Sequence, residues 1–236
     1  AGLAGGFLAY FLHPRRRDTW GGPFNGQQAR QQLFRELAAA FDFPVIVETG
    51  SHRGTTTAFL RRASRATVHT TDTSPRCQGY CRARFLTARR VRVHDLDSRL
   101  LLQRLLPHLV AHAAGSVFFY LDAHWAADLP LREECALILQ SHLPAVIMID
   151  DFEVPGDPGF GFDDYGAGRR LCLAYLASLQ GLTAFFPTCP AGQETGARRG
   201  CVVLATTPAI AQRLHRIPTL RPAPPPAAAV PGLATT

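Results

Sequence analysis

Five acidic residues recur along the chain at nearly equal spacing, and each follows a short apolar run. They are Glu48, Asp72, Asp97, Asp122 and Asp150, separated by 24, 25, 25 and 28 residues. One strand and one helix fit into each interval. In open α/β sheets ligands bind outside the carboxyl ends of the strands, so these side chains would gather around one site. One such aspartate is ordinarily a cap or turn residue, but a series of five favours a binding site.

The apolar runs alternate with helical patterns, which predicts a doubly wound α/β fold with a mostly parallel, Rossmann-like sheet. The predicted strands are 45–47, 67–70, 91–93, 117–121 and 146–149, and the predicted helices are 28–41, 55–64, 75–88, 98–112 and 129–142. A further helix is expected over 169–180. Two last apolar runs, 183–186 and 201–205, are close enough in sequence to pair antiparallel. The predicted sheet thus has seven strands and ends in an antiparallel pair.

The chain of 236 residues fits one such domain, and its 47% hydrophobic content excludes disorder of the whole chain. We expect an N-terminal extension over 1–27, the α/β domain over 28–216 and a disordered Pro/Ala-rich tail over 217–236. The apolar stretch 2–12 is shorter than the roughly twenty residues that span a bilayer. It therefore favours a terminal packing segment over a truncated membrane anchor.

All of the basic excess comes from arginine, since the sequence contains no lysine and its net charge is +7. A basic balance is compatible with nucleic acid, an anionic membrane or an acidic substrate. Because the arginines are scattered over predicted helices, a solvated face is the simpler interpretation. The six cysteines form no disulfide framework, so reduced thiols and a cytoplasmic location are expected.

A glycine-containing turn follows the first predicted strand and its acid. It runs from Glu48 through Gly50 and Ser51 to Gly54, and a helical pattern begins directly afterwards. Glycines permit a tight turn and close backbone approach, and the following helix offers unpaired amides. The dinucleotide fingerprint G-x-G-x-x-G of oxidoreductases is not met here.

This segment resembles motif I of the class I S-adenosylmethionine-dependent methyltransferases, and the similarity extends over about residues 43–206. The resemblance implies that Glu48, Gly50, Ser51 and Gly54 surround the methionine part of S-adenosylmethionine. It also implies that Asp72 binds the ribose hydroxyls and that Asp97 and Ser98 lie near the adenine. One departure is His52, which stands where many members carry glycine and puts the detailed cofactor pose in question.

The acceptor side is expected around Asp122 and His124 and around Asp150 and Asp151. Three carboxylates at the ends of adjacent strands, Asp122, Asp150 and Asp151, are oxygen ligands suited to Mg²⁺. His124 is a candidate general base for a substrate hydroxyl, with Asp122 as its catalytic partner. The arrangement resembles metal-dependent O-methyltransferases of the catechol and macrocin types. The plainer alternatives are an acceptor-orienting or capping role for the acids and a simple packing role for His124.

The predicted activity is methylation of a hydroxyl on a small molecule such as a sugar, a phenol or a natural product. Asp122-Ala-His-Trp replaces the Asn/Asp-Pro-Pro-aromatic run typical of base-amino methyltransferases, which favours oxygen as the acceptor atom. An RNA-directed methyltransferase and a non-catalytic cofactor-binding module remain the alternatives. Residues 152–168 are expected to form either a lid over the acceptor or a self-packed loop. Trp125 is either an acceptor wall or ordinary packing.

Overall fold

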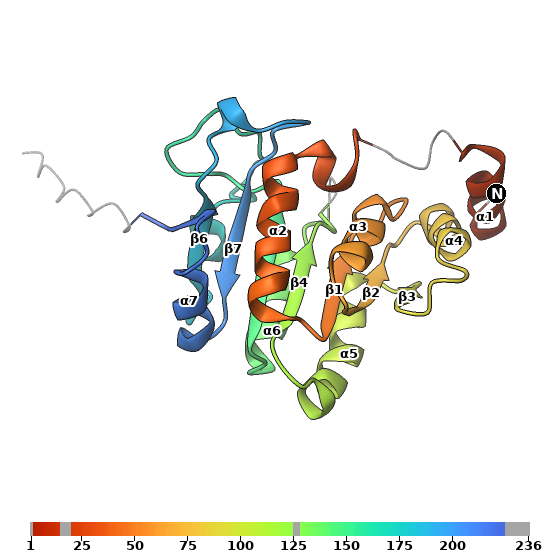
Figure 1. Cartoon of the computed structure of the whole chain (residues 1–236), viewed down its shortest axis with the longest axis horizontal. Helices are drawn as coiled ribbons and strands as arrows, with labels where there is room; N and C mark the ends of the chain where they lie inside the picture. The colour runs from red at the N-terminus through yellow and green to blue at the C-terminus, as the bar shows by residue number, and fades with distance from the viewer. Residues whose placement is uncertain (1, 15–19, 125–127, 225–236) are drawn as a thin grey trace, which may run out of the picture.

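A single mixed β-sheet runs through the molecule, with helices on both of its faces (Figure 1). The computed structural model describes residues 2–14, 20–124 and 128–224. The strands are β1 (Val45–Thr49), β2 (Thr67–Thr71), β3 (Val91–His94), β4 (Val117–Leu121), β5 (Ala145–Asp150), β6 (Thr183–Pro187), β7 (Cys201–Ala205) and β8 (Leu220–Pro222). Their order is β3-β2-β1-β4-β5-β7-β6-β8.

The first five strands are parallel, and the remaining strands pair antiparallel. The predicted doubly wound fold and its C-terminal antiparallel pair are therefore confirmed. The sheet has one strand more than the seven expected, because β8 pairs with β6 through Phe186 and Arg221. This strand lies inside the segment 217–236 that was expected to be disordered, so the ordered part of the sheet extends beyond residue 216. Residues 225–236 lie outside the described residues.

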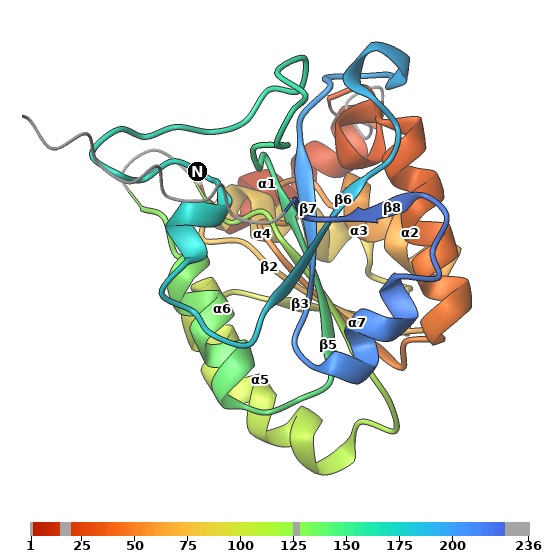
Figure 2. The ribbon, with the colours of Figure 1, turned by 90° about the vertical axis from the view of Figure 1, so that its left-hand side faces the viewer.

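The helices cover the two faces of the sheet as two layers (Figure 2). They are α1 (Leu3–Leu12), α2 (Gln28–Phe41), α3 (Thr55–Ala63), α4 (Pro75–Arg84), α5 (Ser98–His112), α6 (Leu131–Gln140) and α7 (Pro208–Leu214), with short 3₁₀ turns at η2 (Pro23–Gly26), η3 (Leu173–Leu176) and η4 (Ala191–Gln193). Side chains of α2, α3 and α7 share one core cluster with the sheet. Those of α5 and α6 share the other. Such two-sided burial explains why β4 and β5 are almost continuously apolar.

The helix predicted over 169–180 is absent, and only the 3₁₀ turn η3 forms there. Backbone hydrogen bonds to the preceding loop occupy this segment instead. The Leu171 amide donates to the carbonyl of Asp163, and the Glu153 amide donates to the carbonyl of Leu171. In a helix over 169–180 the Leu171 carbonyl would accept a bond from within the helix, but here it accepts from the Glu153 amide, so tertiary pairing replaces the local helical pattern at this point.

The N-terminal apolar stretch forms α1, which packs tightly against α4, as expected for a terminal packing segment. Two glycines allow this close approach. A Cβ on Gly6 would lie 1.9 Å from the carbonyl oxygen of Arg76, and one on Gly79 would lie 1.9 Å from that of Leu3. Within the described residues, no helix combines the length and apolarity needed to cross a membrane.

The N-terminus of α2 is fixed by the β6–β7 connection. The carboxylate of Glu194 accepts hydrogen bonds from the Ala29 and Arg30 amides, and the Thr195 hydroxyl accepts one from the Gln28 amide. An anionic side chain at this position satisfies free amides and complements the helix dipole. This contact places the start of α2 beside the carboxyl end of β5 and the amino end of β7.

Candidate functional site

A cavity of about 800 Å³ opens at the carboxyl ends of the parallel strands. Six of the seven residues predicted to bind the cofactor line it, namely Glu48, Gly50, Ser51, Asp72, Asp97 and Ser98. Asp122, His124 and Asp151 line the same cavity. Four of the five strand-end acids, all except Asp150, thus converge on this cavity. The cavity is large enough for two small molecules side by side.

The turn after β1 brings the backbone of the two halves of the cavity together. Gly50 has φ of +84°, and a Cβ there would lie 2.1 Å from the carbonyl oxygen of Asp122. Gly54, at φ of +69°, does not line the cavity but packs against the ring of Phe85. His52 also adopts a positive φ, +45°, which is uncommon for a residue with a side chain. Gly54 therefore contributes to the conformation and packing of the turn and does not line the cavity.

Glu48 is buried at the floor of the cavity. Its carboxylate accepts hydrogen bonds from the hydroxyls of Thr57 and Thr70, which fix it between α3 and β2. Burial raises the pKa of Glu48 to about 7, and the two hydroxyl bonds only partly oppose that shift. The Glu48 side chain therefore links β1 to α3 and β2, and its carboxyl group gains or loses its proton near neutral pH.

Asp72 orders the loop on the far side of the cavity. Its Oδ2 accepts from the His52 amide at 2.7 Å, and its Oδ1 accepts from the Ser74 amide at 2.8 Å. Burial raises the pKa of Asp72 despite these bonds. Each carboxylate oxygen keeps a second lone pair, so the side chain can still accept from a ligand hydroxyl.

Asp97 caps the N-terminus of α5 and is held by Arg99. Its Oδ1 accepts from the Arg99 amide at 2.9 Å, and its carboxylate pairs with the Arg99 guanidinium at 2.9 Å. The hydrogen bond from the Arg99 side chain lowers the pKa of Asp97. The neighbouring Ser98 hydroxyl is buried, so Asp97 forms the more accessible part of this wall.

A carboxylate–histidine group stands at the ends of β4 and β5. The ligand atoms of Asp122, His124 and Asp151 lie within 4.8 Å of one another. His124 Nε2 is 3.5 Å from Asp151 Oδ2 and 4.0 Å from Asp122 Oδ1. This ring nitrogen is buried and has no hydrogen-bond partner among the described residues. An orphaned nitrogen between two carboxylates is a donor set that fits a divalent cation.

The electrostatics of the two acids differ. Burial raises the pKa of Asp122, and the nearby charges of Asp150 and Asp151 add to the effect. Burial opposes ionisation of Asp151 as well, but His124 and Arg199 outweigh it and lower the pKa of Asp151. Because like charges crowd this corner, a bound cation would relieve their repulsion.

Asp150 does not join this group, which corrects the predicted ligand set of Asp122, Asp150 and Asp151. Its carboxylate is fully buried, pairs with the guanidinium of Arg30 and accepts from Tyr120 Oη at 2.7 Å. Asp150 is the last residue of β5, whereas Asp151 follows the strand with φ of +53°, so the two carboxylates leave the backbone in different directions. His124 takes the place of Asp150 among the candidate ligands.

Two further charged residues at this corner carry no signal in the sequence. Arg199, just before β7, donates to Asp151 and to Asp163 of the long loop. Tyr165 in turn donates to Asp163 Oδ2 at 2.6 Å. Arg199 and Asp163 line the cavity, whereas the sequence suggested only a solvated arginine and a loop acid.

The loop 152–168 packs against the core as a self-packed loop does, and its role as a lid stays a prediction. Phe152 and Phe160 are buried in the core, as in a self-packed loop. Among the described lining residues, Asp163 is the loop's contribution to the cavity. Trp125, expected as an acceptor wall or packing residue, lies outside the described residues.

Glu134 on α6 is another functional candidate that the sequence did not single out. It is buried beneath the cavity, where burial raises its pKa to about 7, and its carboxyl lies beside Thr49 and Ser98. Its position on a helix face with apolar neighbours resembles a core position in sequence, so only the packing reveals it.

No family model matches the sequence, and no curated protein is detectably similar to it. Solved structures do match. A putative O-methyltransferase from Klebsiella pneumoniae is similar at a TM-score of 0.55 and 16% identity, over 87% of this chain and 97% of that chain. The apo structure of CmcI-N160 is similar at a TM-score of 0.51 and 16% identity, over 76% of this chain and 71% of that chain. With its strand order and C-terminal antiparallel pair, this chain has the Rossmann-like fold of the class I methyltransferases.

Proposed function

We propose that this chain is an S-adenosylmethionine-dependent methyltransferase that transfers a methyl group to a hydroxyl of a small molecule. One observation carries the proposal. The cavity that collects six of the seven residues expected for the cofactor also contains the group of Asp122, His124 and Asp151. The residues expected around the methyl donor and those expected around the methyl acceptor therefore line the same cavity. The likeness to a putative O-methyltransferase supports the same activity.

The cofactor is assigned to the half of the cavity over β1, β2 and β3. Asp72 has lone pairs left for two vicinal ribose hydroxyls, since each oxygen accepts only one backbone amide. Gly50 lets the turn after β1 lie against the backbone of Asp122, which bounds this half of the cavity. The adenine is assigned to the wall formed by Asp97 and Ser98.

The acceptor is assigned to the half of the cavity over β4 and β5. Methyl transfer from a sulfonium is an in-line displacement, so the residues must align the acceptor oxygen and assist loss of its proton. Asp122, His124 and Asp151 are the residues that would hold a divalent cation there. Such a cation, when bound, lowers the pKa of a coordinated hydroxyl. Arg199 and Asp163 fix the orientation of Asp151.

His124 has two roles that exclude each other, because both use Nε2. As a ligand it donates its lone pair to the cation, and as a general base it accepts the acceptor's proton. We favour the ligand role, since the buried nitrogen has no hydrogen-bond partner among the described residues and sits between two carboxylates. The mixed nitrogen and oxygen donors suit Mn²⁺ as well as the expected Mg²⁺.

A small acceptor is favoured over RNA because the acceptor half of the cavity is acidic. Asp122, Asp151 and Asp163 line it, and Arg199 is engaged by two of them. These carboxylates would repel the negative charges of a phosphate backbone, whereas they would not repel a neutral polyol or phenol.

We also propose that the protein works in the reducing environment of the cytoplasm. All six cysteines are free thiols, including Cys189 and Cys201 on either side of the β6–β7 connection. Disulfides are expected mainly in oxidising compartments.

Calorimetric titration with S-adenosylhomocysteine tests the cofactor assignment. We expect stoichiometric binding to the native chain and at least about a tenfold weaker affinity for Asp72→Asn, since one charge-assisted hydrogen bond amounts to roughly 1.5–3 kcal/mol. Asp95→Asn is the matched control, because Asp95 is exposed and pairs with Arg82 away from the cavity. Absence of binding to demonstrably folded protein would refute the proposal.

A further inference from the structure

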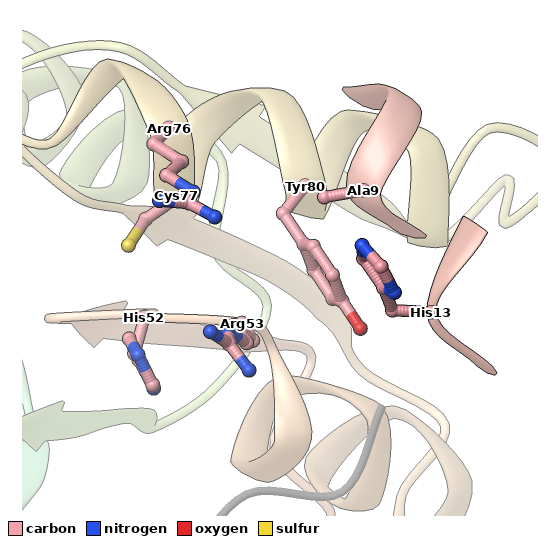
Figure 3. Close-up of a pocket in the computed structure, with 7 residues that line it drawn as sticks. All are labelled: Ala9, His13, His52, Arg53, Arg76, Cys77 and Tyr80. Atoms are coloured by element: carbon pink, nitrogen blue, oxygen red, sulfur yellow. The ribbon is translucent and has the colours of Figure 1, made fainter. Parts of the chain in front are cut away.

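A second cavity, of about 140 Å³, lies between α1, α4 and the turn after β1 (Figure 3). Its lining residues are Ala9, His13, His52, Arg53, Arg76, Cys77 and Tyr80. Figure 3 shows side chains from the three segments facing one gap. His52, Arg53 and Cys77 also line the main cavity, so the two cavities are neighbours that share one wall.

This small cavity is cationic. Two arginines and two histidines line it, and its described lining residues include no carboxylate. Arg53 comes from the turn after β1 and Arg76 from α4, so two guanidinium-bearing side chains from different segments border one cavity. Asp72 is the acid that acts on His52 and Cys77 from the main-cavity side. Its oxygens accept from the backbone amides of His52 and Ser74.

The walls of the cavity are held by close packing. The guanidinium carbon of Arg53 lies 5.6 Å from the ring centroid of Tyr80, a cation–π contact that limits its conformations. Gly6 sits against the carbonyl of Arg76, which leaves no room for the backbone of α1 and α4 to approach further. The Arg53 side chain and the backbone that carries Arg76 are thus held in place before any ligand arrives, which lowers the entropic cost of binding.

We infer that this cavity binds an oxyanion of the phosphate class. A planar guanidinium group can donate two parallel hydrogen bonds to two oxygens of one phosphate. The charge of two arginines also matches a phosphate dianion better than a single carboxylate. The volume of about 140 Å³ accommodates one such group but not a whole nucleotide. Because His52, Arg53 and Cys77 are shared, a ligand with a phosphate group can extend from this cavity into the main one.

The phosphate can belong to a soluble ester or to a lipid headgroup. The neighbouring helix α1 exposes Leu8, Phe11 and Leu12, with 57%, 52% and 69% of each residue accessible. Such apolar side chains beside a phosphate site would meet the acyl region of a bilayer. The experiment therefore includes both sources.

Titration calorimetry of the full chain with inorganic phosphate, at constant ionic strength, tests the site. Arg76→Gln is the informative variant, because Arg76 lines the small cavity but not the main one. We expect phosphate affinity to fall at least about tenfold in Arg76→Gln. S-adenosylhomocysteine affinity and the melting temperature should stay unchanged. Arg62→Gln, an exposed arginine of α3 outside both cavities, is the control and should bind phosphate like the native chain.

No phosphate binding by the native chain, or an equal loss in Arg76→Gln and Arg62→Gln, would overturn the inference. Cosedimentation with phosphatidylcholine vesicles containing phosphatidic acid then identifies the source. Vesicle binding that requires both Arg76 and Phe11 supports a lipid headgroup. Phosphate binding without vesicle binding supports a soluble phosphate ester. The result is independent of methyl transfer, since no cofactor is present in either assay.

Discussion

The backbone of Gly50 lies directly against the carbonyl oxygen of Asp122, at a separation that would leave a Cβ only 2.1 Å from that oxygen. Gly50 directly follows β1 on the cofactor side, and Asp122 directly follows the neighbouring strand β4 on the acceptor side. The contact fixes the distance between the two halves of the cavity. Any side chain at position 50 must separate them.

Gly50→Ala should therefore weaken S-adenosylhomocysteine binding at least about tenfold and lower the melting temperature. The clash adds to the cost of a positive φ, which is on the order of 1 kcal/mol for a residue with a Cβ. Gly181→Ala is the matched control, since Gly181 has φ of +92° but a Cβ there would meet no atom within 4 Å. Equal effects of the two substitutions in calorimetry and thermal denaturation would contradict the role of the Gly50–Asp122 contact.

Removal of one carboxylate from the carboxylate–histidine group should weaken divalent cation binding. We expect Asp122→Asn and Asp151→Asn each to reduce Mn²⁺ affinity at least about tenfold, because even residues supporting metal ligands contribute 10–100-fold. Titration of free Mn²⁺ by electron paramagnetic resonance measures this without any turnover. Asp164→Asn, an exposed acid of the same loop as Asp163, should bind Mn²⁺ like the native chain. An unchanged affinity in both cavity variants would exclude this ligand set.

Arg30 and Asp150 form a buried ion pair that should govern stability. Both side chains are at most 2% exposed, so Arg30→Met would leave a buried carboxylate without its partner. Loss of one partner of such a pair costs about 3–5 kcal/mol, which urea denaturation can measure. Arg82→Met breaks an exposed pair with Asp95 and should cost less than about 1 kcal/mol. Similar losses in the two variants would contradict a special role for the buried pair.

Glu48 should make the protein less stable as pH rises from about 4.5 to 7. Its folded pKa is raised to about 7 from 4.5, so the unfolded chain releases this proton first and the folded state is penalised in that window. A shift of this size corresponds to roughly 3 kcal/mol. Glu48→Gln keeps an oxygen acceptor for Thr57 and Thr70 but cannot ionise. Denaturation at several pH values should show a smaller pH-dependent loss in Glu48→Gln than in the native chain. An identical loss would place the cause elsewhere, for example at Glu134, whose pKa is also raised to about 7.

The sequence by itself determined the order of elements and the location of the cavity. Apolar runs of strand length, each ended by an acid, identify the parallel strands, because burial on both faces requires continuous apolar strands. The glycine turn after β1 was recognisable since φ above zero and close approach both call for glycine. Six of the residues predicted around the cofactor line one cavity for these local reasons.

The tertiary structure alone decided which side chains meet at the acceptor corner. Asp150 and Asp151 are adjacent in sequence, yet Arg30, 120 residues away, draws one into the core while the other faces His124. Arg199 reaches Asp151 across 48 residues, and Glu134 lies under the cavity from a helix with no motif of its own. Likewise, loop hydrogen bonds replace a helix over 169–180, and pairing with β6 orders β8. A sequence pattern records what a residue needs locally, whereas the direction of a charged side chain depends on the partner that long-range folding brings to it.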